Sequence, residues 1–173
     1  MKTIKTLVIA IAACAAFSCT DDDSNNSNNN NNNNNGNPVA GTYNLTSVFA
    51  PEAVNFNMDE TSSNELMDET QCYQGSKIIL NNDNTFTSTL NYVIIGEQVE
   101  CTSEEGSGTY TLSGNILVLT NNAVVPPTTV EYAIQDSGEI TKIFSDYTYP
   151  TRDAEGNAVY AMGNTKFTYT PVD

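Results

Sequence analysis

The side chains in this sequence that could take part in chemistry are mostly carboxylates. Twenty-one acidic residues face six basic ones and histidine is absent, so the formal net charge is −15. Without histidine there is no Ser-His-Asp triad, no Cys-His pair and no histidine-containing zinc site. Carboxylate chemistry and the binding of hard cations such as calcium are the options that remain.

The carboxylates are densest in one short stretch, which contains Asp59, Glu60, Glu65, Asp68 and Glu69. Their spacing does not match an EF-hand loop. No apolar run lies beside them that could raise the pKa of a carboxyl group, as acid–base catalysis by paired carboxylates requires. We therefore expect a solvent-exposed acidic loop, with calcium binding as the alternative. We predict no catalytic residue, no metal site and no cofactor, so the protein is not expected to be an enzyme.

Basic residues are too scattered to recognise phosphate groups. Outside the first few positions only Lys77, Lys142, Arg152 and Lys166 carry a positive charge. Nucleic-acid binding depends on clustered lysine and arginine. We expect no nucleic-acid partner.

Residues 1–18 have the pattern of an export signal. A basic start is followed by an apolar run of about a dozen residues, shorter than the roughly 20 that a membrane-spanning helix needs. Ala16-Phe17-Ser18-Cys19 resembles the lipobox of bacterial lipoproteins, in which cleavage exposes a cysteine that is then acylated. Cleavage before Cys14 instead would leave an apolar region of only about eight residues. We predict that Cys19 is lipidated and anchors the protein to a membrane, since several acyl chains together give stable attachment.

Residues 19–38 form the next segment, which we expect to be a tether. The acidic run Asp21-Asp22-Asp23 is similar to the signal that takes some lipoproteins to the outer face of the outer membrane. The expected location is the outer membrane facing the cell exterior, with the periplasmic face as the alternative. Asn28–Asn35 is an unbroken asparagine run without apolar side chains, so the segment cannot form a core. Its r.m.s. span should be roughly 20–25 Å.

Cys72 and Cys101 remain as an even pair of cysteines in an exported domain. We predict that they form a disulfide, with two free buried thiols as the alternative. Closing a loop of about 30 residues should add roughly 3–4 kcal/mol to the free energy of unfolding.

The elements that must position these residues are β-strands. The clearest is a hairpin over residues 108–120, where Ser113-Gly114-Asn115 turns the chain between two apolar runs. A second hairpin is predicted over residues 76–92, with Asn84 at a turn position that requires positive φ. Further strands are expected at 39–49, 128–135, 139–144 and 164–170, whereas residues 147–159 are expected to be irregular through Pro150. The pattern predicts an all-β domain over residues 39–173, an antiparallel up-and-down barrel of about eight strands.

The segment Gly41–Val48 resembles the opening strand of bacterial lipocalin-like domains, in which a Gly-x-Trp element starts an eight-stranded barrel. The resemblance implies that Tyr43 stands where the family has tryptophan and seals one end of the barrel as a structural plug. It also implies that a basic residue of the last strand, Lys166, packs over this aromatic ring. A long first connection, residues 50–74, would close over the barrel mouth.

Two functions follow from this reading. The first is a binding module, expected to be monomeric, that holds a small and partly apolar ligand in the barrel. The alternative is a non-catalytic structural or interaction module whose barrel is filled and which acts through its loops. The residues predicted to line the ligand site are Leu45, Phe86, Leu90, Tyr110, Leu112, Tyr132, Phe167 and Tyr169.

Overall fold

A computed structural model describes residues 37–172. The predicted leader, the lipidation site Cys19 and most of the tether lie outside these residues, and the corresponding predictions stay predictions. Within the described part of the chain, no helix is both long enough and apolar enough to cross a membrane.

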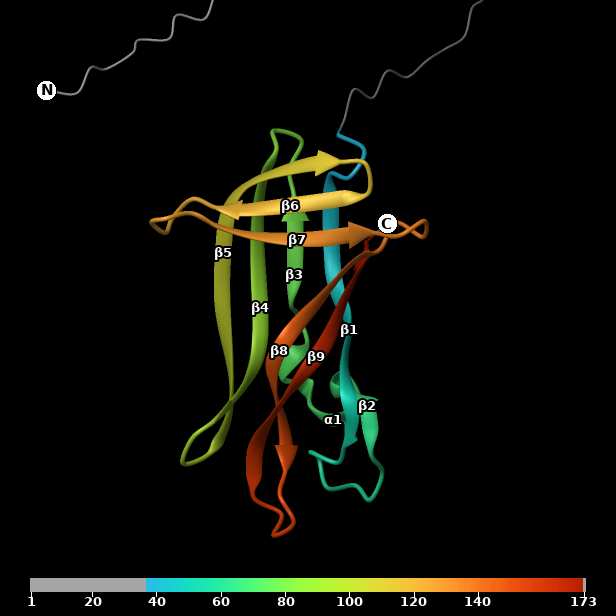
Figure 1. The fold of residues 1–173 in the computed structure, drawn as a ribbon, viewed down its shortest axis with the longest axis vertical. Coiled ribbons are helices and arrows are strands. Elements are labelled where there is room, and N and C mark those ends of the chain that lie inside the picture. Colours follow the sequence, from blue (N-terminus) through green and yellow to red (C-terminus); the bar gives the residue numbers. More distant parts are fainter. Residues whose placement is uncertain (1–36, 173) are drawn as a thin grey trace, which may run out of the picture. The chain divides into compact units, whose positions relative to one another are not determined.

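Eight antiparallel strands close into a barrel (Figure 1). The first strand pairs with the second barrel strand on one side and with the last strand on the other, and the intervening strands follow in chain order. The predicted all-β up-and-down barrel is therefore confirmed. The barrel strands are β1 (Gly41–Val54), β3 (Lys77–Leu80), β4 (Thr85–Ile95), β5 (Val99–Ser113), β6 (Ile116–Asn121), β7 (Thr128–Ile134), β8 (Ile140–Arg152) and β9 (Ala158–Pro171).

The predicted turns form where residues that tolerate positive φ occur. In the β5–β6 hairpin Ser113 pairs with Ile116, and Gly114 between them has a φ of 59°. Asn84 has a φ of 63° in the turn between β3 and β4. Both hairpins predicted from the sequence are thus confirmed, because turn chemistry and apolar alternation agree there.

The connection between β1 and β3 contains three short elements, β2 (Ser63–Glu65), the helix α1 (Leu66–Glu69) and the 3₁₀ helix η1 (Gln71–Tyr73). The β2 strand pairs with β1 outside the barrel. The helix α1 falls inside the acidic stretch.

The expectation that this acidic stretch is simply solvated is wrong for two of its carboxylates. Glu69 is 4% exposed, and its Oε2 accepts a hydrogen bond from the backbone N–H of Phe56 at 2.8 Å. Glu65 Oε1 accepts from the N–H of Val48 at 2.8 Å and from the N–H of Met67 at the start of α1. The carboxylates satisfy backbone donors that have no strand partner, and charge-assisted bonds of this kind are strong.

The prediction of an irregular segment is wrong for residues 147–152, although residues 153–157 do form the turn between β8 and β9. Strand β8 runs on to Arg152, with a bulge between Phe144 and Tyr147 at which Asp146 takes a φ of 55°. Pro150 lies inside the strand, paired with Tyr160 of β9. This half of β8 has a strand neighbour on one side only. Proline is tolerated there because, as at a sheet edge, its missing N–H is not needed for a second ladder.

The expected packing of Lys166 over Tyr43 is also wrong. Lys166 is exposed and pairs with Phe49 of β1, whereas Tyr43 pairs with Pro171 near the end of β9. Since neighbouring residues of a strand point to opposite faces, Lys166 lies on the outer face beside the buried Phe167.

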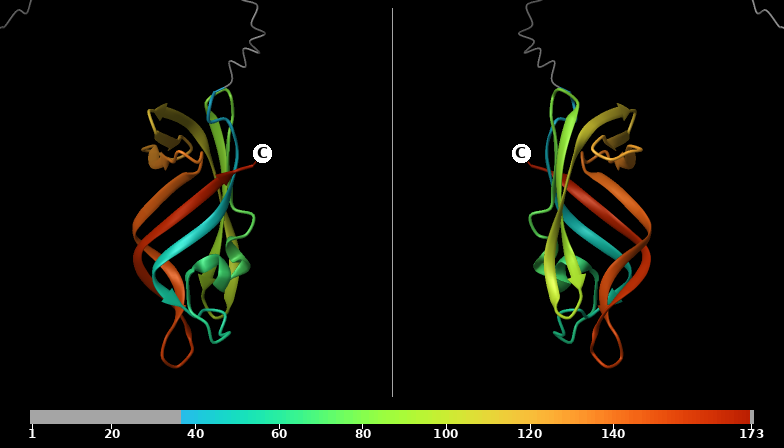
Figure 2. Two further views of the ribbon diagram at one scale, coloured as in Figure 1. Left: turned by 90° about the vertical axis from the view of Figure 1, so that its right-hand side faces the viewer. Right: turned by 90° about the vertical axis from the view of Figure 1, so that its left-hand side faces the viewer.

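The barrel wall is paired unevenly. Strands β7 and β8 share only two residue pairs, Ala133 with Thr141 and Ile134 with Ile140. The first part of β5, residues 99–108, pairs with β4 alone, because β6 begins to pair only at Thr109. Figure 2 shows β3, β4 and β5 on one side of the barrel and β1, β8 and β9 on the other. One side of the barrel is therefore left without ladder hydrogen bonds between β5 and β8.

Candidate functional site

A cavity of about 270 Å³ lies between the walls of the barrel. Most of its lining is aromatic or aliphatic and comes from the inward faces of six strands. The apolar lining residues are Ile78, Phe86, Leu90, Leu119, Val130, Tyr132, Phe144, Tyr147, Phe167 and Tyr169. The remaining lining residues are Ser88, Thr89, Glu104, Glu105, Gly106, Asn121 and Thr128. The mixture of a mostly apolar wall with a few polar groups is that of a small-molecule site, and the volume is just below the roughly 300–1,000 Å³ of pockets for drug-sized ligands, so the cavity suits a smaller molecule.

Aromatic rings hold the deep part of the cavity in a fixed shape. The Phe167 ring meets Phe144 at 5.2 Å between centroids and Tyr147 at 5.1 Å, both edge to face. Tyr132 and Tyr169 meet edge to face at 6.1 Å. Such pairs add about 0.5–1.5 kcal/mol beyond the burial of their surface. The cavity wall is therefore preformed.

Two glycines of β5 allow the Phe86 ring to lie against the wall. Gly108 pairs with Phe86 and Gly106 pairs with Ser88. A Cβ added at position 108 would collide with the carbonyl group of Thr120 and lie 3.1 Å from the Phe86 ring. The absence of a side chain at this position brings β5, β6 and the ring together.

The phenol groups of the cavity stay protonated over the physiological range. Burial raises the pKa of Tyr132 to about 12, and it also raises the pKa of Tyr169 and Tyr147. Burial raises the pKa of Tyr73, with a further contribution from the nearby Tyr147 hydroxyl. Neutral phenols can both donate and accept hydrogen bonds, so the apolar wall has polar groups that could orient a ligand.

A second cavity of about 270 Å³ adjoins the first one. The two share Leu90, Glu104 and Tyr147, which lie on β4, β5 and β8. The other lining residues are Tyr73, Tyr92, Val93, Thr148, Pro150 and Tyr160. The shared residues lie where β5 and β8 lack ladder pairing, so the interior is reached from the side of the barrel.

A comparison with protein families agrees with this geometry. The family model of the lipocalin-like domain matches residues 39–146, which is more than half of the chain. The chain belongs to the lipocalin-like domain family. No curated protein and no solved structure matches it.

Five of the residues predicted to line a ligand site do line the cavity of this lipocalin-like domain: Phe86, Leu90, Tyr132, Phe167 and Tyr169. The other three are outside the lining. Leu45 and Tyr110 are buried in the wall, where the Tyr110 hydroxyl donates to the Asn81 carbonyl at 2.7 Å. Leu112 is 36% exposed near the end of β5. Alternation identifies the inward face but not the length of the barrel over which that face meets the cavity.

The sequence reading missed Phe144 and Tyr147, which make up much of the deep wall. Both lie beside the bulge of β8, where the period of two is interrupted. The only feature of the sequence that could have indicated this wall was the pair of aromatic residues, Phe144 and Tyr147, on either side of Asp146. Glu104 was missed as well, because a carboxylate on the inner face is revealed only by the strand register.

Tyr43 is 6% exposed and is absent from the lining of both barrel cavities. Its hydroxyl donates to the Val39 carbonyl at 3.0 Å, and burial raises its pKa. It lies at the start of β1, where this strand pairs with both β3 and β9. Its position is compatible with the predicted plug, and that role stays a prediction.

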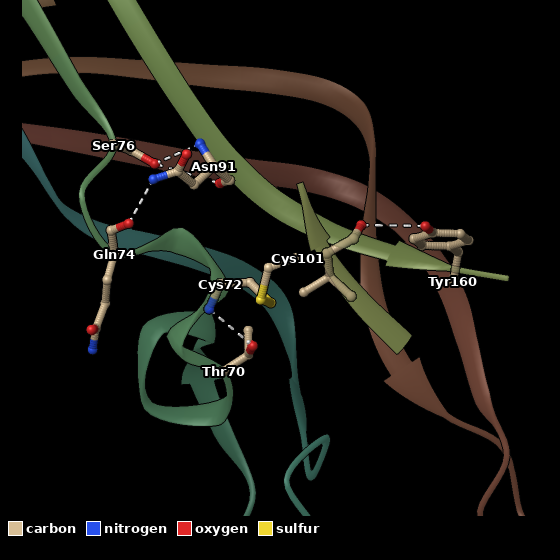
Figure 3. The surroundings of a disulfide bond; sticks show 8 residues. Thr70, Cys72, Gln74, Ser76, Asn91, Cys101 and Tyr160 are labelled. Atoms are coloured by element: carbon tan, nitrogen blue, oxygen red, sulfur yellow. Dashed lines mark hydrogen bonds between the residues drawn. A yellow bond between two sulfur atoms is a disulfide. The ribbon is translucent and has the colours of Figure 1, made fainter. Parts of the chain in front are cut away.

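The predicted disulfide between Cys72 and Cys101 is confirmed, with 5.1 Å between the Cα atoms (Figure 3). It joins η1 to the start of β5. In Figure 3 the Thr70 hydroxyl accepts from the Cys72 N–H, and the Asn91 side chain donates to the Gln74 carbonyl. These contacts fix the long first connection against β4 and β5, at the end of the barrel that holds the second cavity.

Among residues 37–172 no three acidic or cysteine side chains gather closely enough to hold a metal ion. Glu104 and Glu105 are neighbours on one strand and point to opposite faces, so they do not form a facing pair for acid–base chemistry. The arrangement of the described residues suits binding.

Proposed function

We propose that this lipocalin-like protein is a lipid-anchored binding protein of the outer membrane that holds a small, partly apolar molecule in its barrel without catalysing a reaction. The observation that carries this proposal is the aromatic-lined cavity of about 270 Å³ that is reached between β5 and β8. A barrel filled by its own side chains, the alternative reading, would leave no such space.

The expected anchor is Cys19, from which the asparagine-rich tether would hold the barrel away from the membrane. Replacing it, Cys19→Ala, should release the protein from membranes, because the acyl chains supply the attachment. Fractionation of cells expressing each form tests this. A variant that still partitions with membranes would contradict the anchor, and protease accessibility on intact cells would separate the two membrane faces.

Ligand extraction tests the binding role. Because the barrel closes within residues 41–171, the chain from Thr20 onward can be exported with a non-lipidated leader and purified from the native host. Organic extracts of the parent and of Val130→Trp, which places a large side chain in the cavity, would be compared by mass spectrometry. We expect a small molecule that is enriched in the parent only. Equal extracts from both proteins would contradict binding in the barrel.

A further inference from the structure

Glu104 lies on the inner face of the barrel, at its open side. It pairs directly with Leu90, and Leu90 lines the cavity. Residues directly opposite each other on antiparallel strands share a face. Glu104 lines both cavities and is nevertheless exposed, because β5 has no strand neighbour on the side that faces β8.

The next residue, Glu105, provides a contrast. It pairs with Thr89, whose hydroxyl donates to its carboxylate at 3.1 Å, and both residues also border the first cavity. The carboxylate of Glu104 accepts no hydrogen bond from any of residues 37–172. Other glutamates, such as Glu65 and Glu69, accept hydrogen bonds from the backbone. Glu104 is thus a carboxylate at the cavity mouth whose acceptor capacity is unused within the described fold.

Of the basic residues between positions 37 and 172, none lines either cavity. Arg152 donates to the carbonyl groups of Phe56 and Gly156, and Lys166 is on the outer face. The Lys142 ammonium is 5.7 Å from the centroid of the Phe144 ring, outside the lining. Residues 37–172 contain 17 acidic and four basic side chains. The potential at the mouth is therefore negative, and it favours the approach of a cation over that of an anion.

Aromatic rings close to Glu104 also favour a positively charged ligand. Tyr147 lines both cavities together with Glu104, and Tyr92 and Tyr160 line the second one. The face of an aromatic ring attracts an ammonium group, and the attraction grows as water is excluded. A carboxylate and several neighbouring phenol rings together form a suitable site for an organic cation.

We propose that the barrel selects ligands with an apolar body and a single ammonium group, and that Glu104 is the counter-ion at the cavity mouth. This inference rests on the proposed function, since it assigns a ligand class to the same cavity. The apolar body lies among Phe144, Tyr147 and Phe167, and the ammonium group remains at the open side between β5 and β8. Fatty acids and other carboxylates are disfavoured, because their charge would lie next to Glu104.

Three probes that share one chain test the proposal: octylammonium, octan-1-ol and octanoate. Each is titrated at pH 7 into the chain from Thr20 onward, and the dissociation constant is read from NMR chemical-shift changes. We expect octylammonium to bind about tenfold more tightly than octanoate, the size of one charge-assisted contact. The difference should shrink at high salt because the mouth is open to solvent.

The matched variants are Glu104→Gln and Glu131→Gln. Each removes one negative charge, but Glu131 is exposed on β7 and lines neither cavity. Glu104→Gln should weaken octylammonium roughly tenfold and leave octan-1-ol unchanged within about twofold. Glu131→Gln should leave the binding of both probes unchanged within about twofold. Equal effects of the two variants, or tighter binding of octanoate by the parent, would overturn the proposal. Failure of octan-1-ol to bind the parent at all would instead contradict the proposed binding function.

Discussion

Truncation of Tyr43 should destabilise the barrel without affecting ligand binding. The side chain is 6% exposed, lies at the seam where β1 pairs with both β3 and β9, and donates a buried hydrogen bond to the Val39 carbonyl. Removing a buried aromatic side chain typically costs about 3–5 kcal/mol. Removing only the hydroxyl group, in Tyr43→Phe, should cost about 1 kcal/mol, and more if the carbonyl is left without a partner.

These energies convert into melting temperatures through the size of the domain. With about 2.1 cal/mol/K per residue, a domain of about 136 residues has an unfolding entropy near 0.29 kcal/mol/K. Tyr43→Ala should therefore melt about 10–17 °C below the parent, and Tyr43→Phe about 3 °C below it. Differential scanning calorimetry measures both values, and titration with octan-1-ol measures binding on the same samples.

The control is Phe49→Ala on the same strand. Phe49 is 50% exposed on the outer face, so its truncation should lower the melting temperature by no more than about 3 °C. A Tyr43→Ala variant that melts like Phe49→Ala would refute the assignment of Tyr43 as a plug. A variant with normal melting but lost octan-1-ol binding would instead place Tyr43 in the ligand site.

Three further predictions concern the disulfide, the phenol groups and the glycine beneath the Phe86 ring. Replacing Cys72 and Cys101 by serine should lower the free energy of unfolding in urea by about 3–4 kcal/mol, and an unchanged urea midpoint would contradict this. The pKa of Tyr132 is about 12 in the folded protein and near 10 in the unfolded chain, so its contribution to stability is complete below pH 10 and is lost as the pH rises towards 12. By pH 11 the loss should be about 1.4 kcal/mol, and urea unfolding from pH 9 to 11 should show a shallower decline for Tyr132→Phe than for the parent; parallel curves would count against it. Gly108→Ala, whose Cβ would collide with a β6 carbonyl, should cost about 2 kcal/mol or more in thermal unfolding, whereas Ser107→Ala on the exposed face should cost under about 0.5 kcal/mol; equal losses would show that the collision is relieved.

The parts of the fold that could be predicted are those in which local signals agree. Turn residues such as Gly114 and Asn84, together with alternation in β4, predicted the barrel. An even pair of cysteines predicted the disulfide, because pairing in an exported domain depends little on structural detail.

The parts that could not be predicted depend on interruptions and on distant partners. Two features hid the second half of β8, and with it Tyr147 of the cavity wall: the bulge at Asp146, and Pro150 within the strand. Glu69 was read as solvated because its partners, the N–H groups of Phe56 and Asn57, meet it only when the first connection folds back. The inward direction of Glu104 follows from its register with Leu90, which no local pattern supplies.

Binding of an apolar probe in the barrel tests the central claim most directly. Octan-1-ol would be titrated into ¹⁵N-labelled parent protein and into Val130→Trp, whose added ring lies in the cavity lining. We predict saturable shift changes in the parent that concentrate at residues lining the cavity, on β4, β7, β8 and β9, and their loss in a Val130→Trp variant that remains folded. No saturable binding by the parent, or equal binding by both proteins, would contradict the account.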